Sequence, residues 1–244
     1  MAIKIGLAGN PNCGKTTMFN NLTGGKQYVG NWPGVTVEKK VGKLKGHANV
    51  EIVDLPGIYS LSPYTLEEVV TRNFMFDEKP DAIINIIDSS NIERNLYLTT
   101  QILELGIPTV IALNMIDVVE KRGDVINLEK ISQILGCPVV KTSALKGTGT
   151  KEVALKAIEI SKNKNSNKFN MNFSNEVKSA LDEIKSLIHS SNLNQIDANE
   201  QWLAIKLFER DSKLIEKINI PSETMNRIEN IVSKCEKEFD DDAE

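Results

Sequence analysis

The residues with the clearest chemistry form the stretch GNPNCGKTT at positions 9–17. Gly9, Gly14, Lys15 and Thr16 match the spacing G-x-x-x-x-G-K-[ST] of a phosphate-binding loop. In such a loop backbone N–H groups face the phosphates, the lysine reaches the β and γ oxygens, and the threonine hydroxyl binds Mg²⁺. The stretch follows an apolar strand pattern and precedes a helical one, which is the context the motif requires. It predicts a phosphate site with contacts from Asn10, Asn12, Cys13, Gly14, Lys15, Thr16 and Thr17.

A second set of polar residues distinguishes guanine from adenine. Asn114 and Asp117, in NMID, end an apolar run, where a carboxylate can accept hydrogen bonds from the guanine N1–H and exocyclic amine. Adenine has no such donor pair and would leave the carboxylate unsatisfied. TSAL follows the next apolar run, and the Ala144 N–H is expected to reach the guanine O6. The base contacts are therefore expected from Asn114, Met115, Asp117, Ser143, Ala144 and Leu145, and the nucleotide is expected to be GTP or GDP.

The motif DLPG, at 54–57, adds the elements needed for hydrolysis. Asp54 is expected to hold Mg²⁺ through water, and the Gly57 N–H is expected near the γ-phosphate. Thr36 is the candidate that completes Mg²⁺ coordination only when the γ-phosphate is present, which would order loops 26–38 and 54–65 in the GTP state. The alternative for Thr36 is a strand-edge threonine.

Trp32 lies in the same region, within VGNWPG. Two glycines and a proline around it favour a mobile, exposed loop. A packing role for this tryptophan is an equal alternative.

These motifs lie on a part of the chain that alternates strand and helix patterns. Strands are expected at 3–9, 36–46, 49–57, 81–88, 107–115 and 137–144, and helices near 15–23, 65–76, 93–105, 127–135 and 149–162. The pair joined by the turn GHAN is expected to be antiparallel, whereas the later apolar runs lack alternation, as strands covered on both faces do. Residues 1–162 therefore predict an α/β fold of the Ras-like P-loop GTPase kind, with a mostly parallel sheet and helices on both faces.

The remainder of the chain has a different composition. Residues 163–172 are rich in Asn, Ser and Lys and predict a linker, and 173–244 show only helical periodicity, which predicts a small all-α domain. The segment NEQWLAIKLFERD is apolar around much of its girth and is expected to be the central helix. Residues 163–244 carry 11 basic and 16 acidic side chains, so this part does not resemble a basic RNA-binding tail.

Composition narrows the class of protein further. The net charge of −4 argues against a general nucleic-acid partner, and three cysteines without a C-x-x-C pair favour a reducing compartment. The N-terminus lacks the pattern of a signal peptide, and no apolar run approaches the roughly 18 residues of a membrane span. Taken alone, the chain is expected to be soluble in the cytoplasm.

The sequence resembles the N-terminal cytoplasmic region of the ferrous iron transport protein B family. The resemblance rests on GNPNCGKTT, VGNWPGVTVEKK, DLPGIYSLSPY, NIERNLYLTTQILE, ALNMIDV and WLAIKLFERDS, and it covers essentially the whole chain. It implies a G domain and a helical domain of the GDP-dissociation-inhibitor kind, followed by a membrane region that carries the iron. As a part of a longer chain, this region is expected at the cytoplasmic face of the plasma (inner) membrane. Its expected partner is that membrane region, and self-association is left open.

The same resemblance implies a role for Asn12. In related G proteins an asparagine at this position helps to hold K⁺ against the phosphates, where the ion supplies charge in place of an arginine finger. The alternative is that Asn12 makes only a loop hydrogen bond. Cys13 departs from the usual serine or alanine; a plain small-residue substitution and a redox-sensitive thiol at a helix N-terminus are both open.

Ile58 stands where signalling G proteins often have a glutamine that orients the attacking water. Isoleucine cannot bind water, so slow intrinsic turnover is expected. The catalytic residues are then expected to be Lys15, Thr36, Asn12 and Gly57. Two other functions remain open: a GTPase of ribosome assembly or tRNA modification, and a nucleotide-gated binding module in which hydrolysis is incidental.

Overall fold

The computed structural model divides the chain into two compact units, Met1–Asn170 and Met171–Glu244. It describes residues 2–62, 64–162, 169, 171–191, 193, 199–240 and 242–243. The expected linker at 163–172 falls largely outside the described residues. The domain boundaries expected from the sequence stay a prediction.

The first unit is built on a sheet of seven strands among the described residues, in the order β2-β3-β4-β1-β5-β6-β7. The strands are β1 (Ile3–Gly9), β2 (Gln27–Asn31), β3 (Glu38–Leu44), β4 (His47–Asp54), β5 (Ala82–Asp88), β6 (Thr109–Asn114) and β7 (Val139–Lys141). Strand β1 pairs in parallel with β4 and β5, and β6 continues the parallel part to β7. Strands β2, β3 and β4 pair antiparallel. The predicted α/β fold with a mostly parallel sheet is confirmed.

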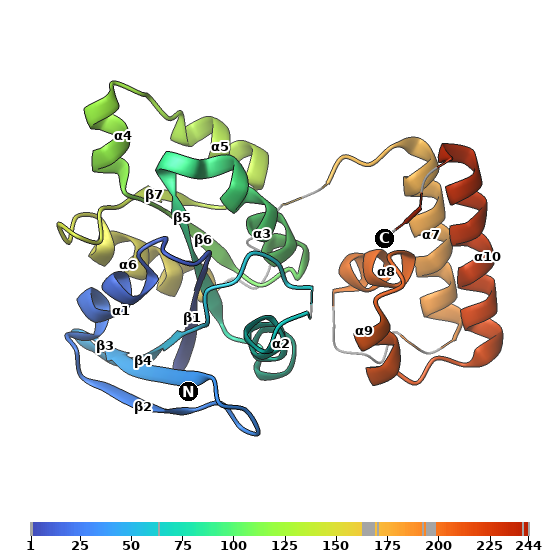
Figure 1. Cartoon of the computed structure of the whole chain (residues 1–244), viewed down its shortest axis with the longest axis horizontal. Helices are drawn as coiled ribbons and strands as arrows, with labels where there is room; N and C mark the ends of the chain where they lie inside the picture. The colour runs from blue at the N-terminus through green and yellow to red at the C-terminus, as the bar shows by residue number, and fades with distance from the viewer. Residues whose placement is uncertain are drawn as a thin grey trace. The chain divides into compact units, whose positions relative to one another are not determined.

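Helices cover both faces of this sheet (Figure 1). They are α1 (Lys15–Thr23), α2 (Leu66–Asn73), the π-helix η1 (Phe74–Glu78), the 3-10 turn η2 (Ser89–Asn91), α3 (Ile92–Glu104), α4 (Ile116–Arg122), α5 (Leu128–Leu135) and α6 (Thr150–Ser161). Residues alternate along β5, so that Ile84 packs in one core with Phe19 of α1 and Val153 of α6. Ile83 packs in another with Leu98 of α3. Burial on both faces explains why the parallel strands read as unbroken apolar runs.

Three local expectations are corrected. The tight turn before β4 lies at Lys45 and Gly46 rather than GHAN, because His47 already pairs with Leu44. The segment expected as a mobile, exposed loop contains strand β2, and Trp32 is buried. Helix α4 was not expected, because it follows the apolar run of β6 after a single residue, Met115.

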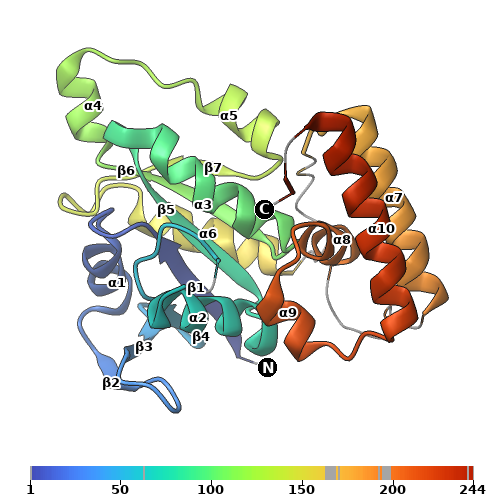
Figure 2. The ribbon, with the colours of Figure 1, turned by 45° about the vertical axis from the view of Figure 1, so that its right-hand side comes forward.

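The second unit consists of helices in its described part, which confirms the all-α expectation. They are α7 (Asn175–Ser190), α8 (Glu200–Phe208), α9 (Ser212–Lys217) and α10 (Ser222–Phe239). Helices α7 and α10 run side by side in two views (Figures 1 and 2). Six consecutive residues of α8, from Trp202 to Leu207, are buried, so α8 is the central helix.

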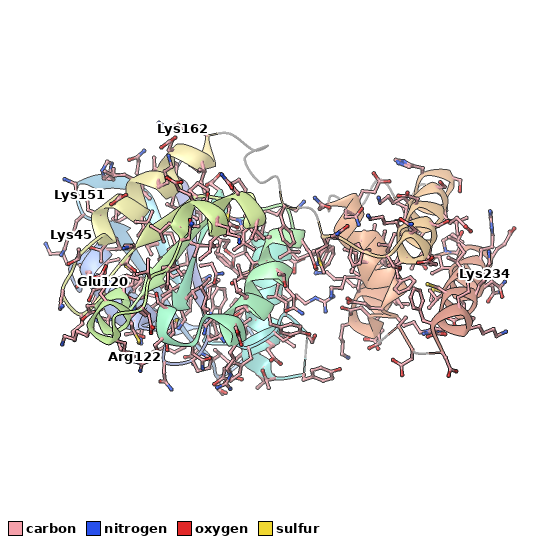
Figure 3. The ribbon with its side chains drawn as sticks, turned by 90° about the horizontal axis from the view of Figure 1, so that it is seen from above. Lys45, Glu120, Arg122, Lys151, Lys162 and Lys234 are labelled. Carbon is pink, nitrogen blue, oxygen red and sulfur yellow. The ribbon has the colours of Figure 1, made fainter. Side chains whose placement is uncertain are left out.

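Charged side chains extend outward from both units, as the labelled Lys45, Lys151 and Lys234 show (Figure 3). Within the described residues, no helix has the length and apolar character needed to cross a membrane.

Candidate nucleotide-binding site

An open cavity of about 520 Å³ lies where β1 and β6 end and α1 begins. Its volume is within the range of roughly 300–1,000 Å³ that small-molecule sites occupy, and the carboxyl ends of parallel strands are where open α/β sheets bind ligands. The residues that line it come from the phosphate-loop motif and from both base motifs. They are Asn12, Gly14, Lys15, Thr16, Thr17, Asn114, Met115, Asp117, Val118, Ser143, Ala144 and Leu145.

The phosphate loop needs glycine at two positions. Gly14 has a φ of 92°, and a Cβ atom there would lie 2.3 Å from Asn114 Nδ2. Gly9 has a φ of 155°, and its Cβ would lie 2.5 Å from the Ile86 carbonyl oxygen. A side chain at either position is disfavoured both by these close neighbours and by the backbone conformation. The loop therefore presents its backbone directly to the cavity at the start of α1.

Lys15 and Asp54 bring opposite charges together behind the loop. Lys15 Nζ lies 3.8 Å from Asp54 Oδ1, and the Asp54 side chain is 8% exposed. Burial raises the pKa of the Asp54 carboxyl above its usual range, and the positive charge of Lys15 opposes that rise. Asp54 Oδ1 is buried without a hydrogen-bond partner among the described residues. A buried carboxylate oxygen with free acceptor capacity, 3.8 Å from the Nζ atom of the phosphate-loop lysine, fits the hard oxygen ligands that Mg²⁺ prefers.

Asn114 joins three loops around the cavity. Its side chain is buried, its Nδ2 donates to the Cys13 carbonyl oxygen at 2.8 Å, and its Oδ1 accepts from the Ala144 N–H at 2.8 Å. The Ser89 hydroxyl donates to the Asn114 carbonyl oxygen at 2.6 Å. In this structure the Ala144 N–H is thus bound to Asn114. Its contact to the guanine O6 stays a prediction.

Asp117 stands in the first turn of α4, beside Met115, whose φ is 60°. Hydrogen bonding to Ser143 and then to Lys146 holds the pKa of Asp117 below its usual range. Lys146 Nζ lies 3.2 Å from Asp117 Oδ2. The side chain is therefore an ionised acceptor at the cavity, which suits a ligand edge with two N–H donors.

Two partners of the site were missed in the sequence. Lys146, which pairs with Asp117, follows TSAL directly, and its position one residue after Leu145 is the signal that could have found it. Asn21 of α1 donates to the Ala144 carbonyl oxygen at 2.6 Å. No sequence pattern indicated that contact, since it joins residues 123 positions apart.

Some of the predicted residues do not line the cavity. Asn10 is buried, and its Nδ2 donates to the Arg94 carbonyl oxygen at 3.5 Å. Thr36 is exposed. Gly57 lies against the phosphate loop, where a Cβ atom would be 3.1 Å from Pro11 Cα. The structure therefore brings Gly57 to the loop, and the Mg²⁺ role of Thr36 stays a prediction.

Trp32 is held inside the first unit. Its ring packs edge-on against Phe74, with centroids 5.7 Å apart at 76°, and Lys39 Nζ lies 4.1 Å from its centroid. The packing alternative for Trp32 is the one the structure favours.

Cys13 is 1% exposed, and burial raises the pKa of its thiol to about 11. At pH 8 only about one such thiol in 1,000 is ionised, and the thiolate is the reactive form. We expect Cys13 in the folded protein to react with iodoacetamide at pH 8 at least about 100-fold more slowly than after unfolding in guanidinium. Mass spectrometry of the peptide that contains Cys13 measures both rates. Rapid labelling of the folded protein would restore the redox-sensitive alternative.

Comparison with known proteins gives one consistent family. The model described as "Ferrous iron transport protein B" matches residues 3–157, and the model of the FeoB cytosolic helical domain matches residues 173–244. The Fe(2+) transporter FeoB of Escherichia coli is 38% identical over 246 residues, which cover 99% of this chain and 31% of the relative. An Fe(2+) transport protein A/Fe(2+) transporter FeoB fusion protein of Porphyromonas gingivalis is 41% identical, covering 87% and 26%. The chain thus spans less than a third of the length of these curated relatives.

Solved structures of similar proteins match this structure over nearly the full chain. An asparagine-to-alanine mutant of S. thermophilus NFeoB, bound to mGDP, is 43% identical with a TM-score of 0.90, covering 100% of this chain and 92% of that one. A glutamate-to-alanine mutant of the same protein, bound to GDP.AlF4-, is 44% identical with a TM-score of 0.86, covering 99% and 93%.

Proposed function

Because this chain belongs to the family of ferrous iron transport protein B, we propose that it binds GTP and GDP and hydrolyses GTP to GDP and phosphate. One observation carries the proposal: a single cavity unites Lys15 and Thr16 of the phosphate loop with Asp117 and Ala144 of the base motifs. The similar S. thermophilus structures with mGDP and GDP.AlF4- support it.

Each residue of the site has a proposed role toward the nucleotide. Lys15 binds the β and γ oxygens, and the N–H groups of residues 12–17 surround the phosphates at the N-terminus of α1. Thr16, Thr36 and Asp54 (through water) hold Mg²⁺, which neutralises charge on the β- and γ-phosphates when bound. Gly57 offers its N–H to the γ-phosphate from beside Pro11. Asp117 accepts from the guanine base.

The switch between nucleotide states is assigned to loops 26–38 and 54–65. Thr36 is exposed, so this side chain would have to move to reach the cavity. The contact between Trp32 and Phe74 joins the first loop to η1, which continues α2 after the second loop. These loops are proposed to become ordered in the GTP state and to be released after hydrolysis.

K⁺ is proposed as a second cation, held by Asn12. Asn12 lines the cavity with an exposed side chain and a φ of 64°. Ile58 is 2% exposed and packs in the core, so its side chain does not reach the cavity. K⁺ would supply positive charge at the phosphates. Turnover without further activation is proposed to be slow.

The biological setting is a ferrous iron transporter. We assign this chain to the cytoplasmic face of the plasma (inner) membrane, where it would regulate the membrane transport region of a longer polypeptide. Family membership and the acidic helical unit count against a GTPase of ribosome assembly or tRNA modification. No nucleic-acid partner is proposed. Self-association is to be measured by light scattering.

The test of the proposed function is direct. Binding of fluorescent GDP, GTP and ATP analogues should show tight binding for guanine only, and incubation with GTP should release phosphate. Equal affinity for ATP would refute the base assignment. Tight GTP binding without any phosphate release would leave a nucleotide-gated binding module as the function.

Replacing Asp117 by asparagine tests base recognition. The variant replaces a double acceptor by a group with one acceptor, so GDP affinity should fall at least about tenfold. The new amide N–H faces a position where xanthine carries an oxygen, so affinity for xanthosine diphosphate should rise.

Glu120→Gln is the matched control, since it removes the same charge from α4 at a residue that does not line the cavity. It should bind GDP as the unmodified protein does. Unchanged GDP affinity in Asp117→Asn would remove Asp117 from the base site.

A further inference from the structure

Helix α3 supports the segment that follows Asp54–Gly57. Ile58 and Leu61 are buried in one apolar cluster with Leu98 and Ile102 of α3. The ring of Tyr59 lies beside Arg94, with the guanidinium carbon 4.2 Å from its centroid. One face of α3 therefore runs along residues 58–61.

Gln101 makes the polar contact on that face. It is 8% exposed, and its Oε1 accepts from the Leu61 N–H at 2.7 Å and from the Ser60 hydroxyl at 3.3 Å. A backbone N–H can only donate, so Gln101 acts here as an acceptor. Ser60 also organises the turn, because the Ser62 N–H donates to its Oγ at 3.0 Å. Without an acceptor at Gln101 the buried Leu61 N–H would be left unsatisfied.

The same segment is tied to the phosphate loop at its other end. The Ile58 N–H donates to the Gly9 carbonyl oxygen at 3.3 Å, and Gly57 lies against Pro11. Only two residues lie between Ile58 and Leu61, so the position of one limits the position of the other. Gln101 thus fixes the Leu61 end of residues 58–61. The Ile58 end of the same segment places Gly57 beside the phosphate loop.

We propose that Gln101 is a positioning residue for GTP hydrolysis: by accepting from Leu61 it fixes residues 58–61 and so the N–H of Gly57. This inference rests on the proposed function. Gln101 does not line the cavity, so it acts through Gly57 rather than on the nucleotide. A misplaced donor at the phosphate affects the transition state more than ground-state binding.

Two variants of Gln101 distinguish the role of its hydrogen-bond acceptor from the role of its side-chain shape. Gln101→Met keeps a similar unbranched side chain without the acceptor, whereas Gln101→Glu keeps an acceptor oxygen whether or not the carboxyl is protonated. Thr100→Ala is the control on the same helix, since the Thr100 hydroxyl donates to the Tyr97 carbonyl oxygen within α3. The measurements are single-turnover GTP hydrolysis, GDP affinity, and hydrogen exchange of the Leu61 amide in the nucleotide-free protein.

In Gln101→Met, hydrolysis should slow about tenfold and Leu61 should exchange at least about tenfold faster, with GDP affinity within about twofold. Gln101→Glu and Thr100→Ala should match the unmodified protein in all three measurements. Unchanged or faster hydrolysis in Gln101→Met, or an equal loss in Gln101→Glu, would overturn the positioning role. Unchanged exchange would show that Gln101 does not hold Leu61. Absence of hydrolysis in the unmodified protein would refute the proposed function instead. The exchange data would still show whether Gln101 holds the Leu61 amide.

Discussion

Replacing Lys15 by alanine should lower GTP affinity at least about 100-fold and abolish measurable hydrolysis. Lys15 is the charged side chain of the loop, and a contact between a cation and a phosphate oxygen contributes about 1.5–3 kcal/mol. Loss of such contacts to two phosphates amounts to about 3 kcal/mol or more, and each 1.4 kcal/mol is a factor of ten. Titration with a fluorescent GTP analogue measures the loss.

A control must distinguish a loss of GTP binding in Lys15→Ala from a loss of folding stability. Asp54 would lose the cation that offsets its burial, so Lys15→Ala should also melt at a lower temperature near neutral pH. Removing Lys15 raises the pKa of Asp54 further, and a raised carboxyl pKa destabilises the fold above that pKa, so the deficit should shrink as pH falls. Lys15→Ala combined with Asp54→Asn should recover the melting temperature and still not bind GTP.

Lys151→Ala, an exposed lysine on α6, should change neither the affinity nor the melting temperature. GTP binding by Lys15→Ala within about threefold of the unmodified protein would contradict the phosphate site.

Local motifs explain how much of the site could be predicted. The loop at 9–17 depends on glycines at fixed spacing between a strand and a helix, and each of these signals lies within a few residues. Asp117 could be placed because it follows an apolar run closely, in the order that parallel strands impose. The alternation of strands and helices in the first unit follows from periodicity, and the structure confirms it apart from β2 and α4, which were not expected.

The features that were missed depend on partners far along the chain. Exposure and packing were equal alternatives for Trp32 in a stretch of Gly and Pro, and contacts such as that with Phe74, 42 positions later, decide for packing. Asn114 lines the cavity, and its side chain also joins Cys13 and Ala144, a pair of contacts that no motif indicates. Its contact to the base stays a prediction. Gln101 carries no motif, because its acceptor role exists only once α3 lies along residues 58–61. Sequence spacing cannot supply such tertiary contacts.

K⁺ should accelerate GTP hydrolysis at least about tenfold relative to Na⁺ at equal ionic strength. The Ile58 side chain is buried in the core, so no side chain directly after DLPG supplies the orientation or charge that a glutamine or arginine gives elsewhere. A cation held by the Asn12 amide oxygen would act where charge develops in the transition state, so it should raise kcat far more than GDP affinity. Na⁺ is smaller and should substitute poorly in a site built from amide and carbonyl oxygens.

Asn12→Ala should therefore erase the difference between the two salts while leaving most nucleotide affinity intact. Its φ of 64° is a conformation that asparagine tolerates better than alanine, so some loss of loop order is expected in this variant. Asn12→Gly removes the amide without that strain, and it should lose the K⁺ response just as fully. Asn20→Ala, at an exposed position on α1, is the control that should keep it. Single-turnover hydrolysis in matched KCl and NaCl decides the matter. Equal rates in both salts for the unmodified protein would take the cation out of the mechanism, and a K⁺ response that survives in Asn12→Gly would assign the ion to other ligands.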